Sequence, residues 1–131
     1  MKDSTDTPEM VGDLMTVDLI SVLAHDRVGR ARELLRSSGL HAVLVMDGND
    51  VLGIVTSVDL VDDWTDDEMV LSAMSPGPTL IDTAATISEA AEMMLSQRVH
   101  HLVVSDEREV IGILSSFDLL EALVAPTRVR P

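Results

Sequence analysis

The feature that most constrains this chain is an internal duplication at a constant spacing of 59 residues. The segment from Gly53 to Leu60 recurs, with conservative changes, from Gly112 to Leu119. The same spacing, without gaps, pairs Met15 with Met74, Ala31 with Ala90, Glu33 with Glu92, His41 with His100, Asp47 with Asp106 and Val51 with Val110. Self-similarity at a fixed period indicates repeated structural units. We therefore divide the chain into copy one, residues 9–61, and copy two, residues 68–121.

The segments outside the copies are short. Residues 1–8 and 122–131 are expected to be tails, and residues 62–67 an acidic linker that also carries Trp64, as an interface anchor or a plug over the core edge. A chain of 131 residues can bury one compact core but not two independent ones. One copy alone would leave an apolar sheet face bare. We therefore expect the two copies to pack face to face about a pseudo-twofold axis.

Each copy predicts the same α+β series of elements. In copy two, Thr86 and Glu89 form a capping-box pattern ahead of an apolar helix stripe, and in copy one Gly39 marks a helix end. Turn residues between apolar runs predict a hairpin in each copy. The expected elements are short helices at 9–15 and 68–74, strands at 19–23 and 79–81, helices from 28 and 87, hairpins at 43–55 and 102–114, and a closing helix in each copy.

The closing string of each copy resembles the cystathionine β-synthase (CBS) domain. Both strings read Gly, two apolar residues, Thr or Ser, two further residues, then Asp-Leu. They follow a Met-Thr or Met-Ser opening and a strand that ends in Asp. The resemblance covers roughly residues 9–121. It implies two tandem β-α-β-β-α repeats, similar to the paired arrangement called a Bateman module, in a stand-alone regulatory protein without catalysis of its own.

One position departs from the family pattern. Many family members carry Pro within the second strand of the repeat, just after the residues that face the ligand. Here Leu44 and Val103 occupy that place. The fold is expected to survive, and the shape of each pocket is expected to differ.

The closing strings also carry a chemical logic of their own. Thr56 and Ser115 lie where a strand ends and a helix begins, so hydroxyl groups and unpaired helix N–H groups converge there and attract anions. Asp59 and Asp118 lie three residues further on, and a carboxylate suits the paired hydroxyls of a ribose. The alternative is that each pair only caps its helix. We favour ligand contact at one or both sites.

The resemblance further implies adenine contacts from the backbone near the first strand of each copy. These residues are Val22 and Leu23 in copy one, and Leu80 and Ile81 in copy two. Without the resemblance, the same four residues would be interpreted as plain core.

Histidines and one arginine distinguish the two copies. His41 and His100 are equivalent, but only copy two adds His101 and Arg98, which offer cationic groups to a phosphate. The two sites are therefore expected to differ in strength, with copy two the stronger. The alternative is that one of the paired histidines caps the strand and the other faces solvent. A metal site built from the three histidines is disfavoured because no paired-ligand spacing is present.

The charge and composition exclude several classes of function. A net charge of −14 repels phosphate backbones, so nucleic-acid binding is not expected. The acidic, lysine-poor composition favours a halophilic protein over an ordinary acidic one. There is no cysteine, no apolar run long enough to cross a membrane and no catalytic constellation. We expect a cytoplasmic protein that is not an enzyme.

The leading hypothesis is a regulatory module that senses an adenosine-containing ligand between the repeats. The candidates are AMP, ADP, ATP and S-adenosylmethionine, with AMP favoured because the negative charge opposes a triphosphate unless salt or Mg²⁺ screens it. Binding would move the copies, or two modules of a homodimer, and so signal to a partner protein. The alternatives are a dimerisation scaffold that has lost ligand binding and a divalent-cation sensor.

Overall fold

The computed structural model describes residues 10–61 and 63–128, which form two compact units. The central unit is one continuous stretch, residues 19–78. The terminal unit joins residues 10–18 to residues 79–128, so the chain starts in this unit, leaves it and returns. The predicted tail at 1–8 and Asp62 of the predicted linker lie outside the described residues.

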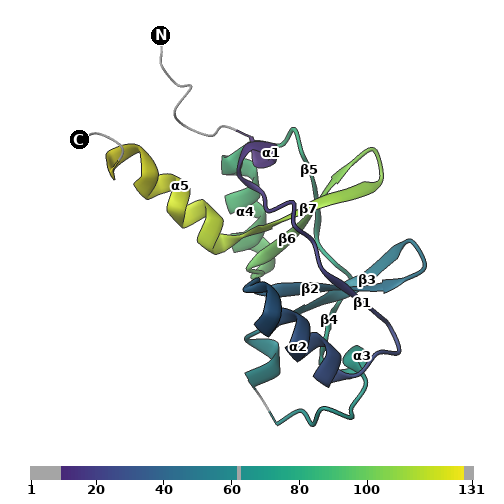
Figure 1. Cartoon of the computed structure of the whole chain (residues 1–131). Coiled ribbons are helices and arrows are strands. Elements are labelled where there is room, and N and C mark those ends of the chain that lie inside the picture. The colour runs from purple at the N-terminus through teal and green to yellow at the C-terminus, as the bar shows by residue number, and fades with distance from the viewer. Residues whose placement is uncertain (1–9, 62, 129–131) are drawn as a thin grey trace. The chain divides into compact units, whose positions relative to one another are not determined.

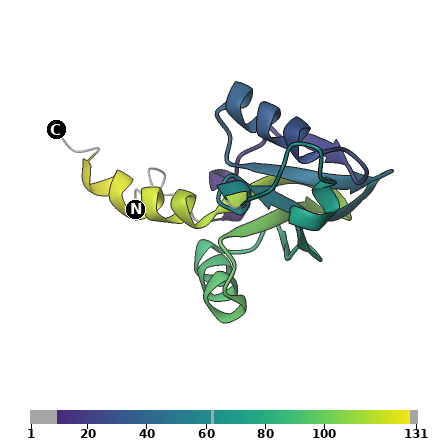
Figure 2. The ribbon, with the colours of Figure 1, turned by 90° about the horizontal axis from the view of Figure 1, so that it is seen from below.

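The central unit contains a mixed four-stranded sheet in the order β1-β2-β3-β4. Strands β1 and β2 are parallel, and the other neighbours are antiparallel. Helix α2 runs along one face of this sheet (Figure 2). The elements are β1 (Ser21–Leu23), α2 (Val28–Ser38), β2 (Ala42–Asp47), β3 (Asp50–Thr56), the 3₁₀ turn η2 (Asp59–Val61), α3 (Val70–Ala73) and β4 (Ser75–Pro76).

The terminal unit repeats this plan with a three-stranded sheet in the order β5-β6-β7. Its strands pair as their counterparts do, β5 parallel to β6 and β6 antiparallel to β7 (Figure 1). The elements are α1 (Val11–Leu14), β5 (Leu80–Asp82), α4 (Ile87–Gln97), β6 (His101–Asp106), β7 (Glu109–Ser115) and α5 (Ser116–Arg128). The mixed α+β class predicted for both copies is confirmed.

Each unit has its own core between a helix and one face of its sheet, which differs from the single core expected from the chain length. In the central unit, α2 buries Val28, Ala31 and Leu35 against the sheet, and Trp64 packs on the edge of this cluster, as a plug over the core would. In the terminal unit, α4 buries Ala90 and Met94. The strand residues that meet these helices alternate along each strand, as the pleat requires: Val43, Val45 and Val55 in one unit, and Leu102, Val104 and Leu114 in the other.

The start of α4 and the end of α2 lie at the capping residues that the sequence predicts. The hydroxyl of Thr86 accepts a hydrogen bond from the Glu89 N–H at 3.0 Å, and the Glu89 carboxylate accepts one from the Thr86 N–H at 2.8 Å. This reciprocal pair satisfies two amide groups that would otherwise be unpaired at the start of α4. Helix α2 ends at Gly39, whose φ of 74° is a left-handed conformation that glycine adopts without steric cost.

The opening segment of each copy packs in the unit of the other copy. Residue Thr16 of copy one bridges to Ile113 on β7, and at the equivalent place Ser75 of copy two pairs with Ile54 on β3. The short helices follow the same rule, since the Val11 N–H donates to the Ala85 carbonyl and the Val70 N–H to the Asp26 carbonyl. Each unit is therefore completed by a segment that belongs, in sequence, to the other copy.

The glycine of each closing string allows this close approach. A Cβ atom on Gly112 would lie 2.6 Å from Met15 Sδ and 3.0 Å from the Thr16 carbonyl oxygen. On Gly53 it would lie 3.0 Å from Met74 Sδ and closer still to the carbonyl oxygen of Ser75. The recurring glycine and the recurring methionine are thus explained together, because they touch across this crossing of strands.

The closing helix predicted for copy one is wrong in extent. Copy two forms the 13-residue helix α5, whereas copy one forms only the three-residue turn η2. After Leu60 the chain continues with Val61 and four aspartates around Trp64 and Thr65, which are poor helix formers. Copy two has Leu119, Leu120, Glu121, Ala122 and Leu123 at this stage, which are good ones. Helix α5 continues past residue 121 to Arg128.

Candidate functional site

In the central unit, Thr56 and Asp59 form a reciprocal pair where β3 ends. The Thr56 N–H donates to Asp59 Oδ2 at 2.9 Å, and the Asp59 N–H donates to Thr56 Oγ1 at 3.1 Å. Both side chains are partly buried. The pair folds the chain back on itself directly after the strand, so the carboxylate lies beside the strand end.

In the terminal unit, Ser115 and Asp118 repeat this geometry. The Ser115 N–H donates to Asp118 Oδ2 at 2.9 Å, and the Asp118 N–H donates to Ser115 Oγ at 3.0 Å. The capping interpretation is therefore present in both copies. The capping hydrogen bond uses only Oδ2 of each aspartate. Within the described part of the chain, no hydrogen bond to Oδ1 of either aspartate is formed. As far as the described residues go, each Oδ1 keeps its lone pairs for a further donor.

The two sites differ in the element that follows the strand. Ser115 and Asp118 lie at the start of a 13-residue α-helix, where the aligned peptide dipoles place partial positive charge. Asp59 lies in a turn of three residues, which has no comparable dipole. The expectation that both strings open a helix is therefore met in copy two, whereas copy one opens a 3₁₀ turn, and the attraction of anions stays a prediction.

The histidines before the second strand reach the closing strings. The carbonyl oxygen of His41 accepts from the Ser57 N–H at 3.0 Å, and that of His100 accepts from the Ser116 N–H at 2.8 Å. In copy two, Ser116 Oγ also lies 3.4 Å from His100 Nδ1. Sequence reasoning did not single out Ser116, although its match with Ser57 at the repeat spacing was a usable signal.

His101 lies directly across the strand pair from Ser115. The two residues are Cα partners in the β6–β7 register, so their side chains share one face of the sheet. This is the face opposite Leu102 and Leu114, which point into the core. In copy one the partner of Thr56 is Ala42. The structure thus gives copy two an imidazole where copy one has a methyl group.

Arg98 ends helix α4 in a left-handed conformation, with φ 57° and ψ 44°. Its equivalent in copy one is Gly39, for which this conformation is unstrained. The side chain is exposed, two residues before His100. Non-glycine residues in sparsely populated backbone regions are found preferentially at functional positions.

The first-strand residues do not gather at the closing strings. Val22 and Ile81 are 3% and 6% exposed and their side chains belong to the two cores, so the predicted contacts at these two residues would come from the backbone alone. Leu23 pairs with Met46, four residues along β2 from the partner of Thr56, or about 13 Å away at strand spacing. Leu80 pairs with Val103, two residues from His101 and hence about 7 Å from it.

The strand register also shows that Val22 and Leu23 are not the equivalents of Leu80 and Ile81, respectively. Leu80 is equivalent to Ser21, because both lie opposite the second-strand residue that replaces the family's Pro. At that residue the backbone N–H is in use: Leu44 donates to the Ile20 carbonyl at 3.0 Å, and Val103 to the Thr79 carbonyl at 2.8 Å. A proline at either place would lose this bond between the strands.

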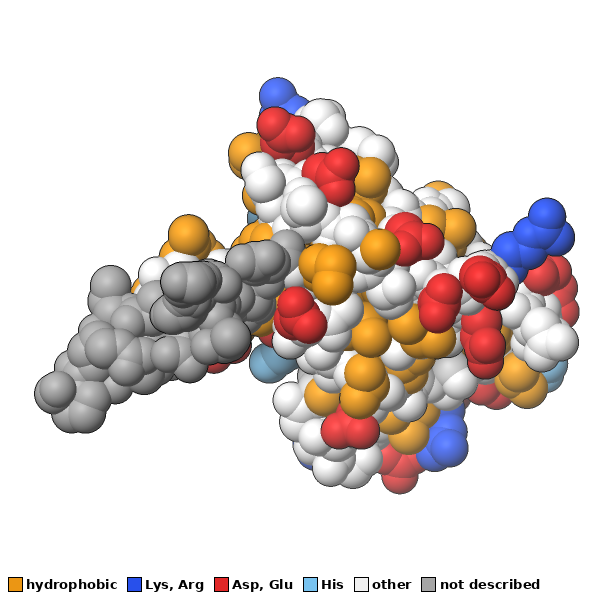
Figure 3. Space-filling model, turned by 90° about the horizontal axis from the view of Figure 1, so that it is seen from above, with side chains coloured by type: hydrophobic (Ala, Val, Ile, Leu, Met, Phe, Trp, Pro, Cys, Tyr) orange, Lys and Arg blue, Asp and Glu red, His pale blue; other side chains and the backbone are white. Residues whose placement is uncertain are grey.

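The surface agrees with the acidic composition. On the face in Figure 3, Asp and Glu side chains are more widely spread than Lys and Arg. Among the described residues, no group of three or more His, Asp or Glu side chains is placed to hold a metal ion. Over the same residues, no helix has both the length and the apolar character that a membrane span needs.

Comparison with known sequences identifies one family. The family model described as CBS domain matches residues 11–64 and 68–125. The Meiotically up-regulated gene 70 protein of Schizosaccharomyces pombe is 32% identical over 130 residues, which is 92% of this chain. The chain spans only 16% of the length of that relative.

Solved structures show the same fold. A CBS-domain containing protein from Agrobacterium tumefaciens is 26% identical, with a TM-score of 0.81, over 94% of this chain and 99% of that one. CBSX2, solved in complex with AMP, is also 26% identical, with a TM-score of 0.72, over 91% of this chain and 98% of that one.

Proposed function

Because the chain belongs to the CBS domain family, we propose that it is a regulatory module that binds an adenosine-containing ligand and signals to a partner protein. The observation that carries the proposal is the repeated hydroxyl–carboxylate pair. In both copies it holds a carboxylate at a strand end, with one oxygen fixed by the backbone and the other without a hydrogen bond from any described residue. No catalytic role is assigned to the chain.

The pair is suited to a ribose. Asp118 is oriented before any ligand arrives, because Oδ2 is held by the Ser115 N–H. Its Oδ1 accepts from a ribose hydroxyl without rearrangement, and preorganisation of this kind lowers the cost of binding. The same argument applies to Asp59 in copy one.

AMP is the ligand that the charges favour, and copy two is the stronger site. Arg98, His100, His101 and the start of α5 supply the donors and the positive potential that a monophosphate needs. A net charge of −14 disfavours a triphosphate unless Mg²⁺ or salt screens it. The AMP complex of CBSX2 supports this choice of ligand class. ADP, ATP and S-adenosylmethionine are the competing candidates.

The signal would pass through the arrangement of the units. Each sheet has one face covered by a helix and one face that carries further apolar side chains: Leu44 and Ile54 in the central unit, and Val103 and Ile113 in the terminal unit. We propose that a ligand changes the packing on these apolar faces, and that this change is the signal.

A homodimer would use the outer face of α5. This face carries exposed apolar side chains at helical spacing, with Glu121 at its border: Phe117, Leu120, Leu123 and Val124. On a chain of net charge −14, such a face is where a second copy can approach with least repulsion. The scaffold hypothesis rests on this same face, and a dimer that forms equally well without a functional Asp59 or Asp118 would favour it.

The proposal is tested by isothermal titration in high salt with AMP, ADP, Mg²⁺-ATP, S-adenosylmethionine and adenosine. We expect AMP to bind most tightly. Asp118→Asn keeps an oxygen to accept from the Ser115 N–H, so it should change stability by less than about 0.5 kcal/mol. Because it removes the charge, it should weaken AMP at the copy-two site by about tenfold.

Asp118→Ala is the matched comparison, because it removes both the cap and the ligand contact. It should lower the free energy of unfolding by about 1 kcal/mol as well as weaken AMP. Absence of both heat and a shift in melting temperature with every adenosyl compound would rule out the ligand-sensing function. Equal AMP affinity of the Asp118→Asn variant and the unsubstituted chain would show that the carboxylate is a cap alone.

A further inference from the structure

The copy-one site has a structural problem that the copy-two site does not have. Asp118 is held in the first turn of α5, whose 13 residues supply a continuous hydrogen-bond ladder. Asp59 lies in η2, a 3₁₀ turn of three residues in which, among the described residues, the Val61 N–H donates to the Val58 carbonyl at 3.2 Å. An isolated turn of this length is not stable by itself. The pair with Thr56 orients the Asp59 carboxylate, and a contact to the turn that follows would add to this support.

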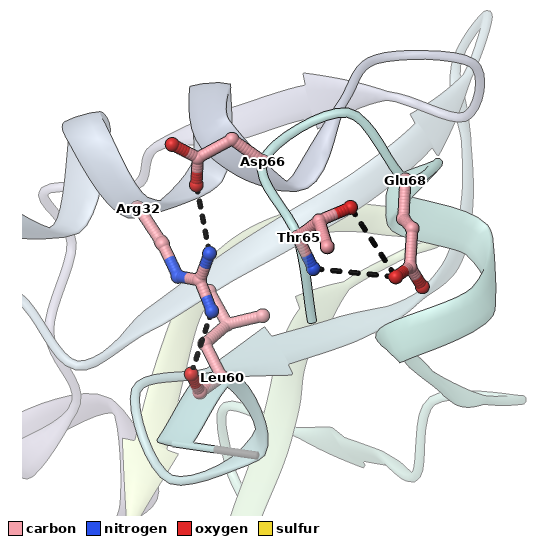
Figure 4. Close-up of polar contacts among 5 residues, drawn as sticks. All are labelled: Arg32, Leu60, Thr65, Asp66 and Glu68. Atoms are coloured by element: carbon pink, nitrogen blue, oxygen red, sulfur yellow. Dashed lines mark hydrogen bonds and ion pairs between the residues drawn. The ribbon is translucent and has the colours of Figure 1, made fainter. Parts of the chain in front are cut away.

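Arg32 of helix α2 provides that support. Its Nη2 donates to the carbonyl oxygen of Leu60 at 3.1 Å, and its Nη1 donates to Asp66 Oδ1 at 2.7 Å (Figure 4). Leu60 is the residue directly after Asp59, and its carbonyl is one that a short helical turn leaves unpaired. A guanidinium at this end of the turn satisfies the carbonyl and complements its partial negative charge.

The bond to the Leu60 carbonyl matters more than the ion pair. The Arg32 side chain is 27% exposed, whereas that of Asp66 is 72% exposed, so the pair with Asp66 is largely screened by solvent. The planar guanidinium nevertheless reaches both oxygens at once, which an ammonium on a flexible stem does less well. Asp66 therefore serves to hold Arg32 in the orientation that reaches Leu60.

The segment that joins the two copies is fastened to the same helix. The Gly29 N–H donates to the Asp66 carbonyl at 3.0 Å, and Arg27 Nη1 donates to the Asp67 carbonyl at 2.6 Å. A Cβ atom on Gly29 would lie 3.0 Å from Asp66 Cβ, so glycine permits this approach. Thr65 and Glu68 form a further turn within the segment (Figure 4).

Copy two has none of these residues at the equivalent positions. The repeat spacing places Ala91 at the position of Arg32, Ser88 at that of Gly29 and Thr86 at that of Arg27. Arginine therefore occurs where the closing helix is missing, and alanine occurs where the helix is complete.

We propose that Arg32 is a positioning residue for the copy-one site, which orients Asp59 through the Leu60 carbonyl and links that site to the connecting segment through Asp66. The ligand half of this inference rests on the proposed function. Its consequence is that helix α5 supports the copy-two site, whereas Arg32 supports the copy-one site. Ligand binding at Asp59 is then coupled to residues 63–68.

The test compares Arg32→Ala with Arg30→Ala. Arg30 lies on the same helix and carries the same charge, but its only described pair is with the exposed Glu33, at 3.3 Å. Hydrogen exchange in the ligand-free chain should be faster by at least about fivefold at the amides of Asp59 and Val61 in Arg32→Ala. The same amides should be unchanged in Arg30→Ala. Arg32→Lys should fall between the two.

AMP titration then separates positioning from a general loss of stability. In an Asp118→Asn background, which reports the copy-one site, Arg32→Ala should weaken AMP by about five- to tenfold. In an Asp59→Asn background, which reports the copy-two site, the change should stay below about twofold.

Two results would overturn the inference in distinguishable ways. Unchanged exchange at Asp59 and Val61 would show that Arg32 does not position the turn. Equal weakening in both backgrounds would show that Arg32 acts only through overall stability or charge. If the unsubstituted chain binds no AMP, the proposed function fails and the ligand role of Arg32 fails with it, while the exchange measurement still decides the positioning role.

Discussion

Asp59 and Asp118 each use one carboxylate oxygen as a cap, and the other oxygen is the one proposed to contact a ligand. Oδ2 of each accepts from the backbone N–H of the residue three positions earlier, which ends the strand and starts the next turn. The remaining oxygen is then presented in a fixed orientation. Capping and ligand contact are therefore compatible interpretations of the same residues, and only a variant that retains the cap while it removes the charge can separate them.

Arg98 gives a second prediction at the residue scale. Its left-handed backbone is unfavourable for any residue with a Cβ atom, so Arg98→Gly should raise the free energy of unfolding by about 0.5–1 kcal/mol. If Arg98 binds the phosphate of AMP, the same variant should also weaken AMP. Chemical denaturation and titration on one preparation measure both effects.

Arg36 is the control for this prediction, because the same substitution there should have the opposite effect on stability. It lies in the last turn of α2 with helical neighbours, so Arg36→Gly should lower stability by about 1 kcal/mol and leave AMP binding unchanged. A variant Arg98→Gly that is less stable than the unsubstituted chain would contradict the strain argument.

At the scale of elements, the exchange of opening segments explains the glycine in each closing string. The backbone at Ser75 crosses β3 at Gly53, and the backbone at Thr16 crosses β7 at Gly112. A side chain at either glycine would push the opening segment off the sheet. The strings are thus needed for the fold, independently of any ligand.

Gly53→Ala should therefore be strongly destabilising, by about 2–3 kcal/mol, because its Cβ would meet the Ser75 carbonyl, a backbone group that cannot move aside. Gly112→Ala should cost less, since its nearest neighbour is the sulfur of Met15, the end of a flexible side chain. Urea denaturation measures both. Gly12→Ala, whose Cβ would lie 3.3 Å from the nearest atom, is the control, and an equal loss there would remove the explanation.

For the whole molecule, charge is the dominant property. A net charge of −14 on 131 residues favours expansion of the chain at low ionic strength. Screening shortens the reach of this repulsion from about 10 Å at 0.1 M salt to about 3 Å at 1 M. The halophilic character stays a prediction, based on this net charge and the low lysine content.

The melting temperature should accordingly rise as KCl is increased from low concentration, with most of the rise complete once screening is strong. Differential scanning calorimetry over a KCl series measures it, and sedimentation velocity on the same samples reports the proposed dimer. A melting temperature that is independent of KCl would contradict the halophilic interpretation. If the melting temperature instead keeps rising at high salt, and rises equally when sulfate replaces chloride, the cause would be a general effect of salt on the solvent.

Most of the local structure was predictable because it depends on short-range pattern. Capping residues predict the start of α4 at Thr86 and the end of α2 at Gly39. Turn residues and the alternation of apolar residues within a few positions predict the two hairpins and the α+β class. The duplication itself required nothing but comparison of the chain with its own sequence. The candidate pairs Thr56–Asp59 and Ser115–Asp118 were likewise local, three residues apart.

The remaining features depend on contacts between residues far apart in the chain. These features are the exchange of opening segments and the placement of Val22 and Ile81 in the cores. They also include the hydrogen bonds from Arg32 to Leu60 and Asp66. No local pattern relates the positions that they join. The truncated closing helix of copy one is intermediate, because its weak helix formers were visible, but the arginine that replaces the missing turns was not. Propensity acts within a few residues, whereas packing and long-range hydrogen bonds are set only when the chain has folded.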